Sequence, residues 1–149
     1  MNTATSLFKW TLIWFWALWW TTVFLTDFLG GLKHLGFPHA SWITDANYPM
    51  LVKSLQLYPL LPSLASLLFV LIIAWSLLAS LVFWRVVFTS YQNSTLWRYR
   101  MKIAFFISLE LWLAFFLSDQ VIMNFDLEQN HMIQGGFSII NFTLSNINS

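Results

Sequence analysis

Long apolar stretches separated by short polar segments dominate this sequence. They cover residues 8–29, 63–84 and 103–125, and each contains few charged side chains. At 1.5 Å per residue such a stretch forms a helix of about 33 Å, which is enough to cross a hydrocarbon layer of about 30 Å. The pattern therefore predicts three transmembrane helices.

Residues 132–148 form a fourth, more polar stretch. They are uncharged and just long enough to cross, but they include Asn141, Asn146 and Asn148. Amide side chains are costly in hydrocarbon unless other helices cover them. The sequence favours a fourth crossing, with a tail at the membrane surface as the alternative. The expected fold is an all-α membrane domain spanning residues 1–149, a bundle of four transmembrane helices, or three if the last stretch does not cross.

The one sizeable connection, residues 30–58, lies between the first two spans. Turn-forming residues punctuate it and argue against one long helix: Gly30, Gly31, Gly36, Pro38 and Pro49. Residues 47–58, NYPMLVKSLQLY, have one apolar face and predict a short helix along the membrane surface. Asn47 is a suitable N-cap for this helix, and a proline suits its first turn.

Composition supports a membrane setting. Hydrophobic residues make up 58% of the chain and charged residues only 9%, whereas about a quarter of a soluble domain is charged. The surface must therefore face lipid or other subunits. The net charge of +1 gives no reason to expect nucleic acid, and the lack of cysteine excludes thiolate metal sites and thiol nucleophiles.

Basic residues are distributed unequally between the two sides of the predicted membrane. Five lie on the side of the N-terminus: Lys9, Arg85, Arg98, Arg100 and Lys102. Only Lys33 and Lys53 lie on the other side. The positive-inside rule then predicts a multi-pass protein of the inner or plasma membrane with a cytoplasmic N-terminus. Most acids and all three histidines fall on the outer side.

The exit of the third span, SLELWLAFFLSDQVIMNFDLEQNH, carries the main chemical suggestion. If one helix continues through it, Gln120, Asn124, Glu128 and His131 share a polar stripe. The spacing Glu128-x-x-His131 resembles one half of the Glu-x-x-His signature of di-iron and di-manganese carboxylate bundles. That resemblance covers four residues, and the chain has no second such motif. A dinuclear centre is therefore not expected.

A site for one divalent metal ion can still be drawn from the outer carboxylates and imidazole. The candidate ligands are Asp27, Asp119, Asp126, Glu128 and His131. The alternative is that these residues are solvated at the boundary or cap a following helix. For Asp27 the alternative is a boundary residue bonded to nearby backbone or tryptophan N–H groups. Haem is poorly supported because no histidine lies inside a predicted span.

Glu110 is an acid deep inside the third predicted span. An ionised carboxylate facing lipid there is costly, so Glu110 must pair, protonate or face another subunit. Arg98, Arg100 and Arg85 approach from the cytoplasmic side and are the expected partners for a snorkelling pair. The functional alternative is an acid that carries protons.

Three functions are compatible with these features. The leading hypothesis is an accessory or structural subunit, bound to other membrane subunits or to further copies of itself. The tryptophan-rich first span supports this, since its indoles spread around the helix: Trp10, Trp14, Trp16, Trp19 and Trp20. The competing hypothesis is an enzyme or redox subunit with a metal or quinone site at the outer face. The third is proton-coupled transport by an oligomer that uses Glu110.

Overall fold

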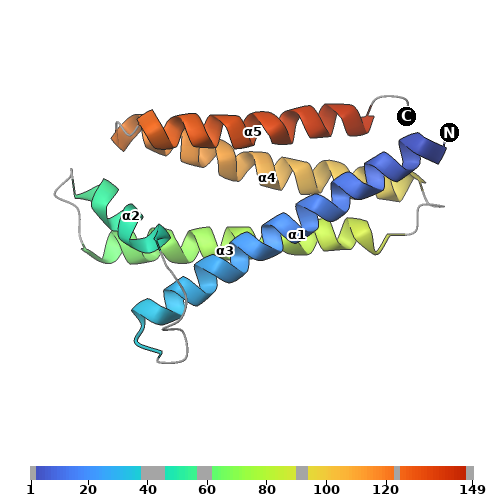
Figure 1. Ribbon diagram of the computed structural model, residues 1–149. Coiled ribbons are helices and arrows are strands. Elements are labelled where there is room, and N and C mark those ends of the chain that lie inside the picture. Colours follow the sequence, from blue (N-terminus) through green and yellow to red (C-terminus); the bar gives the residue numbers. More distant parts are fainter. Residues whose placement is uncertain (1–2, 38–45, 57–61, 90–93, 123–124, 147–149) are drawn as a thin grey trace.

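The computed structural model describes residues 3–37, 46–56, 62–89, 94–122 and 125–146 (Figure 1). These residues form five α-helices and no strand: α1 (Thr3–His34), α2 (Asn47–Leu55), α3 (Pro62–Val87), α4 (Ser94–Ile122) and α5 (Phe125–Asn146). The expected all-α class is confirmed. Three of the helices, α1, α3 and α4, are long and apolar enough to cross a membrane, which suggests a membrane protein.

The first helix extends further than its glycines suggest. The connection expected to begin at residue 30 begins later, because α1 continues through Gly30 and Gly31 to His34. Gly31 instead allows close packing on α3, since a Cβ at this position would lie 3.3 Å from Cδ1 of Ile73. The turn comes at Gly36, whose φ of 82° is favourable only for glycine and a few polar residues.

Hydroxyl and indole groups join the middle of α1 to the last third of α3. The hydroxyl of Thr21 lies 2.8 Å from that of Ser80 and accepts a hydrogen bond of 2.9 Å from Nε1 of Trp84. Thr21 also bonds the carbonyl of Ala17, one turn earlier in its own helix. These partly buried polar groups thus satisfy one another at the contact between the two helices.

An aromatic cluster forms the centre where α1, α3 and α4 meet. The ring of Trp16 stacks on Phe83 at 6.2 Å and meets the edge of Phe105 at 6.1 Å. Phe83 and Phe105 contact each other at 5.3 Å in an edge-to-face arrangement. All three side chains are buried. Such pairs contribute about 0.5–1.5 kcal/mol each beyond their buried area.

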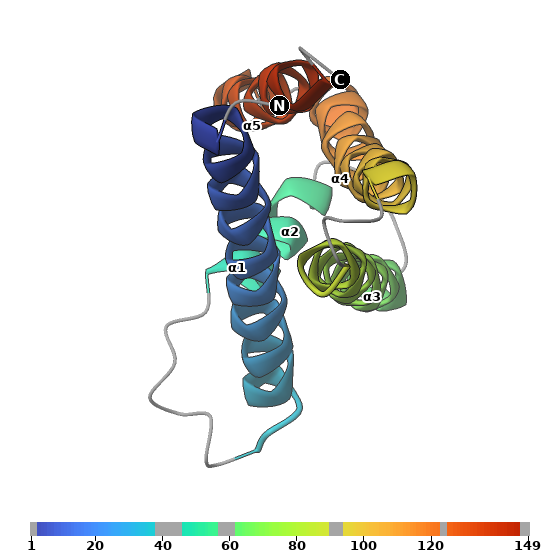
Figure 2. The same cartoon turned by 90° about the vertical axis from the view of Figure 1, so that its right-hand side faces the viewer.

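The last helix, α5, returns along α4 (Figures 1 and 2). Gly135 packs against Trp112, and Phe142, further along α5, packs against Phe105, earlier in α4. The two helices are therefore antiparallel. The interpretation in which one helix continues from the third span to His131 is wrong, because α4 ends at Ile122 and α5 is a separate helix.

The short helix α2 bridges α1 and α3. Tyr48 places its hydroxyl 3.0 Å from that of Ser66, and its ring lies 5.2 Å from Phe69 and 4.4 Å from His34. A short helix beginning at Asn47 is confirmed, but the expected capping role is wrong. The N-cap is Ala46, which makes no side-chain cap bond. The end expected at residue 58 lies outside the described residues.

We expect Thr21→Val to lower the free energy of unfolding by about 1–2 kcal/mol, because it removes two interhelical hydrogen bonds and leaves the N–H of Trp84 unpaired. The measurement is reversible unfolding in mixed detergent micelles. Thr22→Val is the matched control, since this exposed hydroxyl bonds only the carbonyl of Leu18 in its own helix. Equal effects of the two substitutions would contradict a stabilising role for the interhelical network.

Candidate functional site

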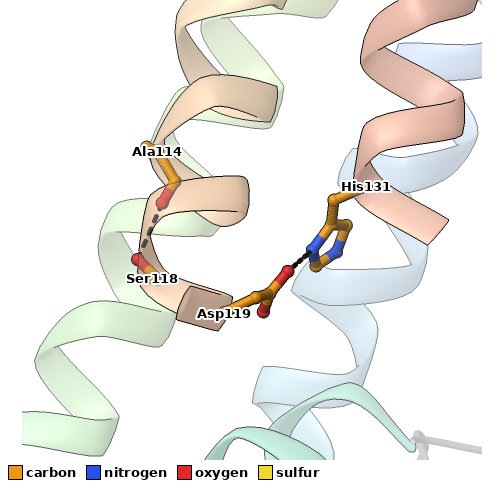
Figure 3. A network of polar contacts seen from close by, with 4 residues as sticks. All are labelled: Ala114, Ser118, Asp119 and His131. Carbon is orange, nitrogen blue, oxygen red and sulfur yellow. Dashed lines mark hydrogen bonds and ion pairs between the residues drawn. The ribbon is translucent and has the colours of Figure 1, made fainter. Parts of the chain in front are cut away.

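The end of the bundle at which α4 finishes and α5 begins holds a carboxylate and an imidazole in contact (Figure 3). Nδ1 of His131 and Oδ2 of Asp119 form a hydrogen bond that is also an ion pair when the imidazole is protonated. The side chain of Asp119 is 5% exposed and that of His131 is 19% exposed. Along one helix, residues 12 apart lie about 18 Å apart, so only the return of α5 brings this pair together.

Hydrogen bonding to the carboxylate orients the imidazole. An ionised carboxylate only accepts hydrogen bonds, so Nδ1 of His131 is the donor when Asp119 is ionised. Nε2 is then the atom that can accept a proton or bind a metal ion. Carboxylates orient metal-binding histidines in the same way. Ser118, beside Asp119, does not take part because its hydroxyl bonds the carbonyl of Ala114 at 2.7 Å (Figure 3).

Aromatic rings enclose the imidazole on the protein side. The ring of His131 stacks on Phe115 with centroids 4.9 Å apart and lies 6.0 Å from Trp112. Trp112 in turn contacts Trp20 at 5.4 Å. Sequence reasoning did not assign the two α4 aromatics to the site. Phe115 and Trp112 precede Asp119 by four and seven residues, so the three share one helix face. This spacing was the signal in the sequence that could have assigned them to the site.

Asp27, near the end of α1, has a different environment. Its side chain is buried and accepts a hydrogen bond of 2.6 Å from the side-chain amide of Asn47, the first residue of α2. A side-chain amide of α2 therefore binds this carboxylate of α1. The contact holds the start of α2 against α1.

The five candidate metal ligands are only partly brought together. Asp119 and His131 are in contact, and Glu128 lies half-buried about one turn before His131 in α5. The described partner of Asp27 is Asn47, and the side chain of Asp126 lies outside the described residues. Among the described side chains, no three of His, Asp or Glu are placed to hold a metal ion. A metal site at these residues stays a prediction.

Glu110 lies on the side of α4 that faces away from the other helices. It is half-buried, and within the described parts of the chain it makes no hydrogen bond or ion pair. The expected pair with an arginine is therefore not formed there. Arg100, one of the expected partners, instead donates a hydrogen bond of 2.9 Å to the hydroxyl of Thr89.

The fold and these contacts define a helical protein with three helices suited to crossing a membrane and a carboxylate–imidazole pair at one end. Comparison of the chain with protein-family models, with curated proteins and with solved structures finds no match.

A double-mutant cycle with Asp119→Ala and His131→Ala is expected to give a coupling energy of about 1.5–3 kcal/mol, the range for hydrogen bonds to charged groups. The measurement is unfolding in detergent of the wild type, both single variants and the double variant. Ser118→Ala combined with His131→Ala is the control, and its coupling should be near zero. If the coupling energy between Asp119 and His131 is as small as that of the control pair, their contact does not stabilise the protein.

Proposed function

We propose that the chain is a four-span protein of the inner or plasma membrane and acts as an accessory or structural subunit of a larger membrane complex. The observation that carries the subunit role is Glu110, an acid in the middle of a membrane-spanning helix with no partner among the described residues. An ionised acid at such a depth is costly unless it is paired. A neighbouring subunit supplies the missing partner.

The packing of α5 supports a fourth crossing. This helix has 22 residues, or about 33 Å. Its serines Ser138 and Ser145 are buried, whereas its exposed side chains include large apolar ones: Met132, Ile133, Phe137, Ile139, Ile140 and Leu144. Mean hydropathy averages both faces and therefore understates how apolar the outer face is. A helix with this arrangement suits lipid outside and protein inside.

Hydroxyl groups of α5 reduce the cost of insertion further. Ser145 donates to the carbonyl of Asn141 at 2.7 Å, and Thr143 donates to that of Ile139 at 3.0 Å. Both bonds stay within the helix, so these groups need no water. With four antiparallel crossings, the start of α1 and the end of α5 lie on one side of the membrane, and Figure 1 shows these two helix ends at the same end of the bundle. The basic residues favour the cytoplasm for that side.

Labelling of single cysteines tests this topology without background, since the chain contains no cysteine. Lys53→Cys is expected to react with a membrane-impermeant maleimide added outside intact cells. Thr95→Cys and a cysteine added after Ser149 are expected to react only after the membrane is opened. A C-terminal cysteine labelled from outside would contradict the fourth crossing but not the first three.

A second candidate function is a membrane enzyme or redox subunit with its site at the outer face. The contact between Asp119 and His131 favours it, because it orients an imidazole as a metal ligand or proton carrier. The pair also has a purely structural explanation, since it joins α4 to α5. Only the composition and activity of the native assembly separate these roles.

Purification from native membranes in mild detergent is expected to recover stoichiometric partner proteins. His131→Ala is expected to leave the activity of that assembly largely intact, with a loss of less than about twofold. The same preparation is analysed for iron, copper, manganese and zinc. Near-stoichiometric metal that Glu128→Ala removes, together with loss of activity in His131→Ala, would favour the enzyme instead. A chain that purifies alone would contradict the subunit role.

A further inference from the structure

We infer that the outward face of α4 binds a transmembrane helix of another protein, and that this helix carries a lysine or arginine opposite Glu110. The inference rests on the proposed subunit role and adds the chemistry of the partner. The α4 outer face consists of Phe106, Glu110, Leu113 and Leu117. Successive members are four, three and four residues apart, so they form one stripe along the helix.

The stripe is the side of α4 that the bundle leaves uncovered. Phe106 is 62% exposed, Leu113 is 51% exposed and Leu117 is 55% exposed. The opposite side of the helix is buried, with Phe105 and Trp112 packed against the other helices. Three large apolar side chains around one acid give a surface on which a second helix can pack, with the acid at its centre.

The position of Glu110 along α4 decides which partner the outer face can bind. Ser94 and Ile122, the two ends of α4, lie about 24 Å and about 18 Å from it along the helix axis. A glutamate side chain cannot cover either distance to reach water. In hydrocarbon the carboxylate must therefore be protonated or meet a donor at its own level. A cation supplies the stronger interaction, because charge-assisted hydrogen bonds are about twice as strong as neutral ones.

A second copy of this chain does not supply that cation. The basic residues of α4 are Arg98, Arg100 and Lys102, and even Lys102 lies about 12 Å nearer the start of the helix than Glu110. A copy inserted in the same orientation carries its cations at the same level as these. Two outer faces packed together would instead place acid against acid, which is unfavourable. Contact through α4 therefore gives Glu110 no complementary charge from a second copy, and that charge comes from a different protein.

The same physics applies to the partner. A lysine or arginine at the centre of a lone transmembrane helix is itself costly in lipid, so the isolated helix is as poorly satisfied as Glu110. Binding joins the two charges and removes both from lipid. The remaining contact consists of apolar side chains, which pack against Phe106, Leu113 and Leu117. We expect a span with one central basic residue and an otherwise apolar face.

Photocrosslinking in native membranes tests the inference. The full chain carries a benzophenone amino acid at position 113, in the α4 outer face, or as a control at position 18, a 53% exposed leucine of α1. Position 113 is expected to yield one discrete adduct whose span has a lysine or arginine. Glu110→Gln, similar in shape but uncharged, is expected to reduce the adduct about tenfold. Exchange of the two charges, with Glu110→Lys in this chain and an acid in place of the basic residue of the partner, is expected to restore the adduct.

The remaining outcomes separate this inference from the subunit role. Partners that co-purify unchanged with Glu110→Gln and crosslink only at position 18 overturn the inference and leave the subunit role standing. An adduct at position 113 with a second copy, with lipid only, or with a span lacking any basic residue also overturns it. A chain without partners overturns both. If Glu110→Gln does not accumulate in the membrane, the partner sequence from the wild-type adduct decides.

Discussion

The return of α5 along α4 is the packing interaction on which the carboxylate–imidazole contact at this end of the bundle depends. It requires a glycine at position 135, because Trp112 packs closely against that position and leaves little room for a side chain. The same packing places His131 against Asp119 and turns Ser138 into the protein. Without α5 the carboxylate of Asp119 would lose the imidazole that binds it, and an unpaired carboxylate shielded from water is costly.

Polar groups elsewhere in the bundle follow the same logic. Lipid tails are as apolar as leucine, so helix association depends on close packing and on hydrogen bonds between helices. Thr21 connects α1 to α3 through Ser80 and Trp84. Trp20 connects α1 to α4 by donating a hydrogen bond of 3.2 Å to Ser108. The indole N–H groups of Trp20 and Trp84 thus serve as donors between helices.

The two acids of α4 illustrate how one helix can serve two purposes. Asp119 faces α5 and meets a histidine, so its partner lies within the chain. Glu110 lies on the opposite side of the helix and finds no partner among the described residues. The first acid joins α4 to α5. The second carries the proposed subunit role and the proposed chemistry of its partner, because an acid at mid-membrane depth is costly unless it is paired.

The sequence by itself determined the helical class and the three long apolar helices, and it singled out Glu110 as an acid inside the third of them. These are properties of local composition and length. Only the tertiary structure decided that Asp119 meets His131 and that Gly31 serves packing and not a turn. A continuous helix satisfies the same residue spacing as two helices packed side by side. Side-chain partners depend on which helix faces meet, and periodicity along the chain does not contain that information.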